Sequence, residues 1–372
     1  MFKRDFKMEN SLEISDNWPK RSEYWTTHSQ KITKRKHYSP RNRHPLILNG
    51  HGVSLSVDRG TLFCRNGFTH YPQIREDYRY FRGDPDLPTR IIISNASGVI
   101  SFSVLQWLSE QKIPLIQLSW DGTPIIVSEF GYSANAKIVA TQYKKLESGA
   151  ANGEFANLIM EKLENSISTL SKLRKNTNNR EAAISQIRRQ QEKLRRLKDL
   201  SNVNIQGIEG QAAAAYFDVW RGIPINWHKS KRTIIPADWA HIGGRRSALG
   251  MTNRNARHPI NGMLNYAYAV LFTQVKIQLL AKGFDPSIGL SHAIKKYRDA
   301  LVLDYMEPLR PVVDANILDI IFLEKLSASD FNITRQGYCR LNPQFAKLIA
   351  HRVEATLRDR FSKAQSQKSI RS

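Results

Sequence analysis

The sequence predicts an α+β protein, with a small N-terminal β-rich domain followed by a larger all-α domain. From residue 46 to about 132, short apolar runs alternate with polar residues or end at turn residues, as is typical of strands. Beyond about residue 135, turn residues become sparse and apolar residues recur at helical spacing. The 372 residues suffice for two domains of ordinary size.

Residues 1–45 precede the β-rich region and form a basic N-terminal arm that we expect to be flexible. They contain 11 Lys and Arg against 5 Asp and Glu, and the basic run "KITKRKHYSPRNRHP" closes the segment. Two interpretations stay open, because such an arm either contacts DNA or only adds solubility.

The β-rich region, residues 46–132, is predicted strand by strand. In "VSLSV" alternate residues, Val53, Leu55 and Val57, share one face, and "DRG" then turns the chain into "TLFC". The run "RIIISNASGVISFSVLQWLSEQKIPLIQLSWDGTPIIV" predicts strands around 91–93, 114–118 and 124–127. A short helix with Leu105 and Leu108 separates the first two, and Asp-Gly predicts a hairpin between the last two.

The remainder, residues 133–372, contains the helical patterns and a polar tail. Residues 172–199 hold 10 Lys and Arg and 3 Asp and Glu. Such a charge run is either a solvent-exposed helix face or a face that contacts the phosphates along a DNA backbone. Further helices are expected around "EGQAAAAYFDVW", "INGMLNYAYAVLFTQVKIQLLAKG", "SHAIKKYRDALVLDYME" and "NPQFAKLIAHRVEATLRDRF".

Charge and composition narrow the class of partner. Lys and Arg number 56 against 33 Asp and Glu, a net charge of +23, which favours a polyanion: nucleic acid first and an anionic membrane surface second. The sequence contains no run of 18 apolar residues, so we expect no membrane span. The N-terminal stretch "MFKRDFKMEN" lacks the apolar core of a secretory signal. The distant cysteines Cys64 and Cys339 are interpreted as reduced thiols, so we expect a cytoplasmic protein.

Polar residues in apolar surroundings are the candidates for chemistry. In "DALVLDYMEPLRPVVD", Asp304 and Glu307 lie one helical turn apart and need a cation if buried, either an arginine or lysine or a metal ion. Glu209 in "GIEGQAAAAYF" is a helix-capping carboxylate or a site residue. His292 in "GFDPSIGLSH" is a surface or core histidine or a ligand. Spacing cannot join these distant residues into a site.

A family resemblance joins them. In their order along the chain, "GIEGQAAAAYF", "HPINGMLNYAYAVL", "GFDPSIGLSH" and "LVLDYMEPLRPVVD" resemble the catalytic subunit of the CRISPR spacer-acquisition complex, an integrase/endonuclease. The run from "IIISNASGVIS" to "DGTPIIV" is similar to the β-domain of that family. The resemblance covers roughly residues 46–360.

The resemblance implies a β-rich dimerisation domain over 46–132 and a helical catalytic domain over 133–372. It implies that Glu209, His292 and Glu307 are metal ligands and that Asp304 is a nearby acidic catalytic residue. The implied activity inserts short foreign DNA fragments into a CRISPR array by 3′-hydroxyl attack on a phosphodiester. The implied partners are prespacer and repeat DNA, a second copy of the chain, and a second, non-catalytic adaptation subunit.

The chemistry calls for a divalent cation and basic contacts. Strand transfer needs the hydroxyl positioned and the phosphate charge stabilised, which Mg²⁺ or Mn²⁺ does as Lewis acid and template. Two carboxylates and an imidazole suit Mn²⁺ better than Mg²⁺, because Mg²⁺ favours imidazole less, so we expect Mn²⁺ to be the better ion in vitro. Basic residues expected to contact DNA, or else only to add solubility, are Arg245, Arg246, Lys295, Lys296, Arg298 and Arg310.

Two other functions remain to be separated from this one. A transposon-type integrase would use the same chemistry, and we interpret the short polar tail after "RVEATLRDRF" as evidence against it. A non-catalytic DNA-binding scaffold would not need Glu209, His292 and Glu307, so the presence of all three argues against a scaffold.

Overall fold

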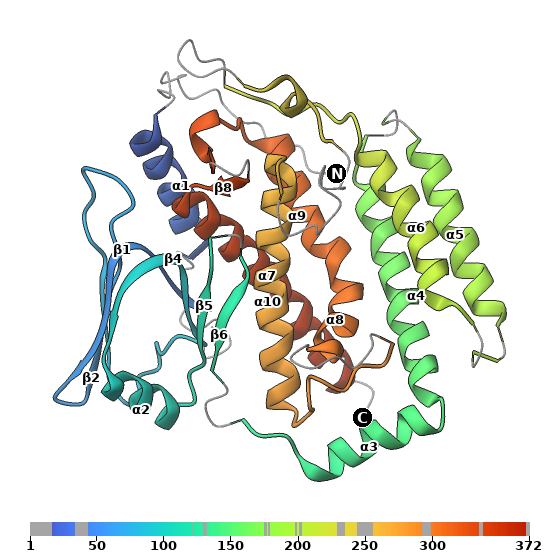
Figure 1. Ribbon diagram of the computed structural model, residues 1–372, viewed down its shortest axis with the longest axis horizontal. Helices are drawn as coiled ribbons and strands as arrows, with labels where there is room; N and C mark the ends of the chain where they lie inside the picture. Colours follow the sequence, from blue (N-terminus) through green and yellow to red (C-terminus); the bar gives the residue numbers. More distant parts are fainter. Residues whose placement is uncertain are drawn as a thin grey trace.

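The computed structural model describes most of the chain. The described residues are 17–33, 44–120, 122–128, 132–174, 177, 179–197, 199–200, 203–228, 235–243, 256–291, 299–334 and 338–369, with side chains as far as residue 360. A mixed sheet lies at one side, a central group of long helices packs against it, and a further group of helices lies beyond (Figure 1).

The elements follow one another along the chain. The strands are β1 (Leu46–Asp58), β2 (Thr61–Arg65), β3 (Asp77–Tyr80), β4 (Ile91–Ile100), β5 (Leu115–Leu118), β6 (Pro124–Val127), β7 (Phe331–Ile333) and β8 (Cys339–Leu341). The helices are α1 (Trp18–Thr33), α2 (Phe102–Glu110), α3 (Ala136–Glu147), α4 (Ala150–Ser171), α5 (Arg180–Arg196), α6 (Ile205–Trp220), α7 (Pro259–Ala281), α8 (Ala300–Met306), α9 (Arg310–Leu323) and α10 (Pro343–Ser369). Short 3₁₀ turns are η2 (Ala237–Trp239), η3 (Glu307–Leu309) and η4 (Ala328–Asp330).

The large sheet has six strands in the order β3-β2-β1-β4-β5-β6, and β1, β4 and β5 run parallel. Both faces of its centre are buried, which explains the unbroken apolar runs in these strands. Ile47, Ile92 and Ile116 face the helical core. Their neighbours in sequence face the opposite way, where Trp107 of α2 covers a second, smaller core. The strand and helix positions expected from the sequence of this region are confirmed.

Strand β1 changes register halfway along its length. Its pairing with β4 shifts between Asn49 and Gly50 and again between His51 and Val53, and both Gly50 and Gly52 have positive φ. A Cβ atom at Gly50 would lie 2.5 Å from the carbonyl oxygen of Phe68, so glycine is required there on both counts.

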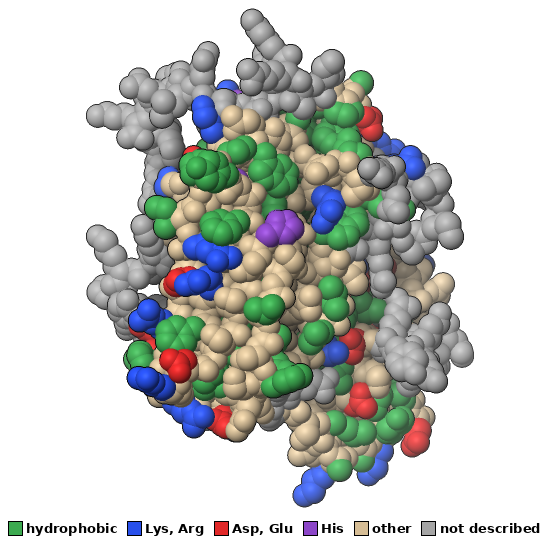
Figure 2. All heavy atoms as spheres, turned by 60° about the vertical axis from the view of Figure 1, so that its left-hand side comes forward, with side chains coloured by type: hydrophobic (Ala, Val, Ile, Leu, Met, Phe, Trp, Pro, Cys, Tyr) green, Lys and Arg blue, Asp and Glu red, His purple; other side chains and the backbone are tan. Residues whose placement is uncertain are grey.

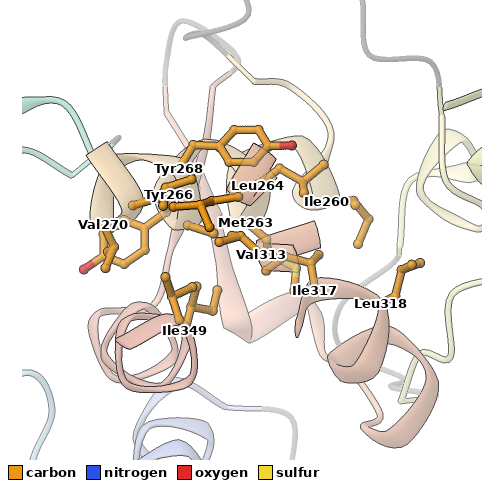
Figure 3. Close-up of a cluster of buried hydrophobic side chains, with 14 of the residues drawn as sticks. Ile260, Met263, Leu264, Tyr266, Tyr268, Val270, Val313, Ile317, Leu318 and Ile349 are labelled. Atoms are coloured by element: carbon orange, nitrogen blue, oxygen red, sulfur yellow. The ribbon is translucent and has the colours of Figure 1, made fainter. Parts of the chain in front are cut away.

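Helix α7 forms the centre of the large core. Buried residues lie on every side of this helix, and neighbouring elements accordingly surround it. Figure 3 shows Ile260, Met263 and Leu264 of α7 gathered with side chains of α9 and with Ile349 of α10. Trp25 of α1 and the inner face of the sheet belong to the same core, so the sheet and the helices share one apolar interior. None of the helices in the described residues has the length and hydropathy needed to cross a membrane.

The expectation of an all-α domain after the β-rich region is wrong, although the α+β layout holds. Strands β7 and β8 lie within the expected helical domain and pair antiparallel, Phe331 with Leu341 and Ile333 with Cys339. Each strand has only three residues, too few to produce a readable alternation in the sequence. The division into a dimerisation and a catalytic domain stays a prediction.

The expectation of a flexible arm over residues 1–45 does not hold for residues 18–33, which form α1 against α10. Arg21 and Trp25 are fully buried. Both donate hydrogen bonds to the carboxylate of Asp330, Arg21 through two nitrogens at 2.7 Å and Trp25 at 2.6 Å. Asp330 lies more than 300 residues further along the chain, so local sequence analysis could not reveal the partner.

We expect Arg21→Ala to destabilise the protein by about 3–5 kcal/mol, because the change leaves a buried carboxylate without its cation. The free energy of unfolding, measured by urea denaturation, tests this. Arg65→Ala is the matched control, since it removes an exposed ion pair with Asp77 and should leave stability close to wild type. Equal stability of the two variants would contradict the role assigned to Arg21.

Candidate active site

Glu209 lies one turn inside helix α6, so it is not the capping residue. Asn204 caps this helix, because its side-chain oxygen accepts a hydrogen bond of 2.7 Å from the Gly207 N–H. The alanines that follow Glu209 have small side chains, and α6 packs against both α4 and α5. The Glu209 side chain remains 23% exposed and faces a cavity between α4, α6 and α9.

Glu307 stands where helix α8 gives way to the 3₁₀ turn η3. Proline follows immediately at residue 308, and since proline has no N–H, the regular α-helical hydrogen bonding is interrupted there. Two side chains of α4 hold the turn. Asn165 donates to the carbonyl oxygen of Pro308 at 2.7 Å, and Thr169 donates to that of Pro311 at 2.8 Å.

Lys162 joins the two carboxylates. It lies on the same face of α4 as Asn165 and Thr169, and its ammonium group donates one hydrogen bond to Glu209 and one to Glu307. The Lys162 side chain is only 12% exposed. Three separate elements, α4, α6 and the α8–η3 junction, therefore converge on one ion-paired cluster.

Arg310 completes the cluster. Its Nε lies 3.0 Å from Oε1 of Glu307, although the N–H is not aligned for a hydrogen bond, and its guanidinium lies 4.9 Å from the centre of the Tyr268 ring. Burial by itself lowers the pKa of Arg310, but the Glu307 carboxylate and further anionic neighbours raise the pKa above its usual value. Arg310 is therefore charged at every physiological pH.

A cavity of about 260 Å³ adjoins the cluster. Tyr216, Phe217 and Tyr268 form its aromatic side, and the carboxylates and Arg310 form its charged side. The hydroxyl of Tyr268 donates a hydrogen bond to Asp314, which also lines the cavity. The cavity therefore combines aromatic rings with three carboxylates and the two cations Lys162 and Arg310.

Asp304 does not face this cavity, even though it lies one turn from Glu307. It is fully buried, and its Oδ2 accepts hydrogen bonds from the backbone N–H of Leu290 at 2.6 Å and of Ser291 at 3.4 Å. These residues directly precede His292 in the sequence. Asp304 thus fixes the chain that leads to the predicted histidine ligand.

The structure brings together Glu209, Glu307 and Arg310 of the predicted site. Asp304, the fourth described residue of that set, lies away from the cavity. The remaining predicted site residues lie outside the described residues, in segments 244–255 and 292–298: Arg245, Arg246, His292, Lys295, Lys296 and Arg298. The assignments of metal ligands and DNA contacts stay predictions.

Sequence analysis missed Lys162. The available signal was its position on α4, where it lies three residues after Ile159 and next to Leu163, both buried. A lysine inside a buried helical stripe requires an anionic partner. The sequence could have suggested a buried ion pair, but it could not identify the two glutamates.

The residues present fit a divalent cation. Carboxylate oxygens of Glu209 and Glu307 already converge on one cation, the Lys162 ammonium, and such oxygens are the donors that Mg²⁺ and Mn²⁺ prefer. Within the part of the chain that the structure describes, no group of three Asp, Glu, His or Cys residues is placed to hold a metal. His292, the third predicted ligand, is not in that part.

This chain is similar to a known protein family and to several known proteins. A family model described as CRISPR associated protein Cas1 matches residues 89–355. The chain is 25% identical over 320 residues to the CRISPR-associated endonuclease Cas1 1 of Archaeoglobus fulgidus, covering 82% of this chain and 85% of that protein. It is 29% identical over 280 residues to the CRISPR-associated endonuclease Cas1 1 of Pyrobaculum aerophilum, covering 73% and 80%.

Solved structures share the fold. A casposase bound to its integration product superposes with a TM-score of 0.67 at 24% identity, covering 84% of this chain and 82% of that one. A Cas1 protein from Thermotoga maritima superposes with a TM-score of 0.62 at 17% identity, covering 85% and 90%. At 24% and 17% identity, these similarities show a shared fold and nothing more specific.

We expect Asp304→Ala to destabilise the protein by about 1–3 kcal/mol, because two backbone N–H groups lose their acceptor. Hydrogen exchange should quicken at the amides of Leu290 and Ser291. Asp285→Ala is the control, since Asp285 accepts from the Ser287 N–H at 2.9 Å in the preceding turn. It should quicken exchange at Ser287 only. Unchanged exchange at Leu290 and Ser291 in Asp304→Ala would contradict the assigned role.

Proposed function

We propose that this chain, which belongs to the CRISPR-associated Cas1 family, is a metal-dependent DNA integrase and endonuclease. Its reaction is insertion of short DNA fragments into a CRISPR array, by attack of a 3′-hydroxyl on a phosphodiester. The observation that carries the proposal is the convergence of the Glu209 and Glu307 carboxylates from separate elements beside a cavity.

Glu209 and Glu307 would hold the cation, together with His292 of the neighbouring segment. A bound Mg²⁺ or Mn²⁺ supplies Lewis-acid stabilisation of the phosphate charge and a template for the attacking hydroxyl. The surrounding protein keeps these ligands in place. Asn165 and Thr169 hold the turn that carries Glu307, and Asp304 holds the chain before His292.

DNA is the proposed substrate, and the charge of the protein supports this. The net charge of +23 favours association with a polyanion. At the cavity itself, Arg310 keeps its charge, and a guanidinium is well suited to phosphate oxygens. Part of that guanidinium is paired with Glu307, so Arg310 would contact DNA while remaining next to a metal ligand.

A transposon-type integrase is the second candidate, because the casposase has a similar fold. Both candidates use the same chemistry and the same residues, so the target distinguishes them. Integration that depends on a CRISPR repeat in the target plasmid supports the CRISPR function. Equal integration into plasmids with and without the repeat supports the transposon-type alternative.

The proposed partners include a second copy of the chain and a non-catalytic adaptation subunit. A chain of the Cas6-RT-Cas1–Cas2 complex has a similar fold, with a TM-score of 0.62 at 18% identity. In this chain several large apolar side chains of the β-rich region are exposed: Val99, Ile100, Phe102, Ile125 and Ile126. Figure 2, which turns the sheet side forward, shows hydrophobic side chains there interspersed with Lys and Arg. We take these exposed apolar side chains as the candidate contact surface for a second copy of the chain.

The metal-ligand assignment predicts that Glu209→Gln, His292→Ala and Glu307→Gln each lose strand transfer almost completely while still binding DNA. The losses should not add in double variants, because one missing ligand already disables the unit. The assay is integration of a fluorescent 3′-hydroxyl duplex into a repeat-bearing plasmid with Mn²⁺. Glu161→Gln is the control. It removes a partly exposed ion pair between Glu161 on α4 and Arg360 on α10, so the variant should keep its activity. A Glu307→Gln protein that still integrates would contradict the proposal.

The interface assignment predicts that light scattering at micromolar concentration finds a dimer, and that Phe102→Asp shifts it towards monomer. Phe102 is 90% exposed, so the folded monomer should tolerate the change. Tyr143→Asp is the control, at a half-exposed aromatic residue on α3 outside the β-rich region. A wild-type monomer would contradict the proposed dimer.

A further inference from the structure

Lys162 occupies the position that a shared cation would take. Its ammonium group lies between carboxylates on two different elements, donating to Oε1 of Glu209 and to Oε2 of Glu307. The other oxygen of Glu307 is next to Arg310. Lys162 is therefore the bridging cation between the two glutamates in this structure.

The chemistry of lysine suits a cation that can leave. Its ammonium is a compact charge on a flexible four-carbon chain, whereas a guanidinium is a rigid fork that binds a carboxylate in a fixed geometry. The Lys162 side chain is 12% exposed and lines the open cavity, so it can turn away from the carboxylates without a movement of α4.

The charges also favour an exchange. The cluster of Lys162, Arg310, Glu209 and Glu307 has two positive and two negative groups, and the nearby carboxylate of Asp314 accepts a hydrogen bond from Tyr268. A divalent cation added to this cluster would meet an ammonium in its place and repel it. Metal and ammonium therefore compete for the same carboxylate oxygens.

We infer that Lys162 is a built-in counter-ion of the metal site, which holds Glu209 and Glu307 together in the metal-free protein and is displaced when a divalent cation binds. The inference rests on the proposed function, because it takes these glutamates as metal ligands. It makes Lys162 a positioning residue that sets metal affinity. A purely structural lysine would only lower stability when replaced.

The test is Mn²⁺ binding to the full chain without DNA, measured by calorimetric titration. Lys162→Met removes the charge and keeps most of the side-chain volume, so Mn²⁺ should bind about 10–100-fold more tightly, as expected when a charged hydrogen-bonded competitor is lost. The metal-free variant should melt below wild type, and Mn²⁺ should raise its melting temperature more than it raises that of wild type. Lys276→Met is the matched control, since the side chain of Lys276 on α7 is 15% exposed and pairs at 3.1 Å with Asp299, the residue before α8.

The outcomes separate the inference from the proposed function. Wild-type binding that Glu209→Gln abolishes, with equal affinity in Lys162→Met, overturns the inference and leaves the metal site intact. Binding in Lys162→Met alone supports the inference strongly. No binding in either protein overturns both.

A measurement on wild type guards against a variant that does not fold. Labelling by an amine-reactive reagent, read by mass spectrometry, should rise at Lys162 when Mn²⁺ saturates the protein and stay constant at Lys276. Constant labelling at both lysines overturns the displacement of Lys162.

Discussion

The repulsion between the Glu209 and Glu307 carboxylates is the main constraint on the arrangement of the candidate site. Two like unit charges about 4 Å apart repel by about 4 kcal/mol at the effective dielectric of a protein near its surface. A cation between these groups offsets that repulsion where helices α4 and α6 and the α8–η3 junction pack together. Lys162 provides this cation, and its charge holds the two proposed metal ligands together.

The turn η3 gives this cluster its geometry. Pro308 and Pro311 interrupt the helical run, so Glu307 projects from the junction between two helices instead of from the middle of one. Helix α4 stabilises the interruption through Asn165 and Thr169 and carries Lys162 on the same face. One helix thus fixes both the backbone and the charge of the site.

Buried ion pairs also join parts of the chain that are far apart in sequence. Arg21 of α1 pairs with Asp330, and Arg90 before β4 pairs with Glu354 of α10. The first pair secures the N-terminal helix, and the second links the start of an interior strand of the sheet to helix α10. These links make the sheet and the helices one packed body, while large apolar side chains of the β-rich region remain exposed.

Local patterns in the sequence were sufficient for most strands of the β-rich region, for helices α5, α6, α7 and α10 and for the α+β layout, because periodicity and turn chemistry depend on neighbouring residues. Strand β3 and helices α3, α4 and α9 were not predicted. Ordered motifs were sufficient for the family. They were not sufficient for α1 or the β7–β8 pair, whose stability comes from contacts across the chain. Nor could they show that Asp304 and Glu307, one turn apart, serve different purposes. Lys162 lies 47 residues from Glu209 and 145 from Glu307, and packing alone places its ammonium between them, because the charge balance of a buried cluster depends on which helices meet.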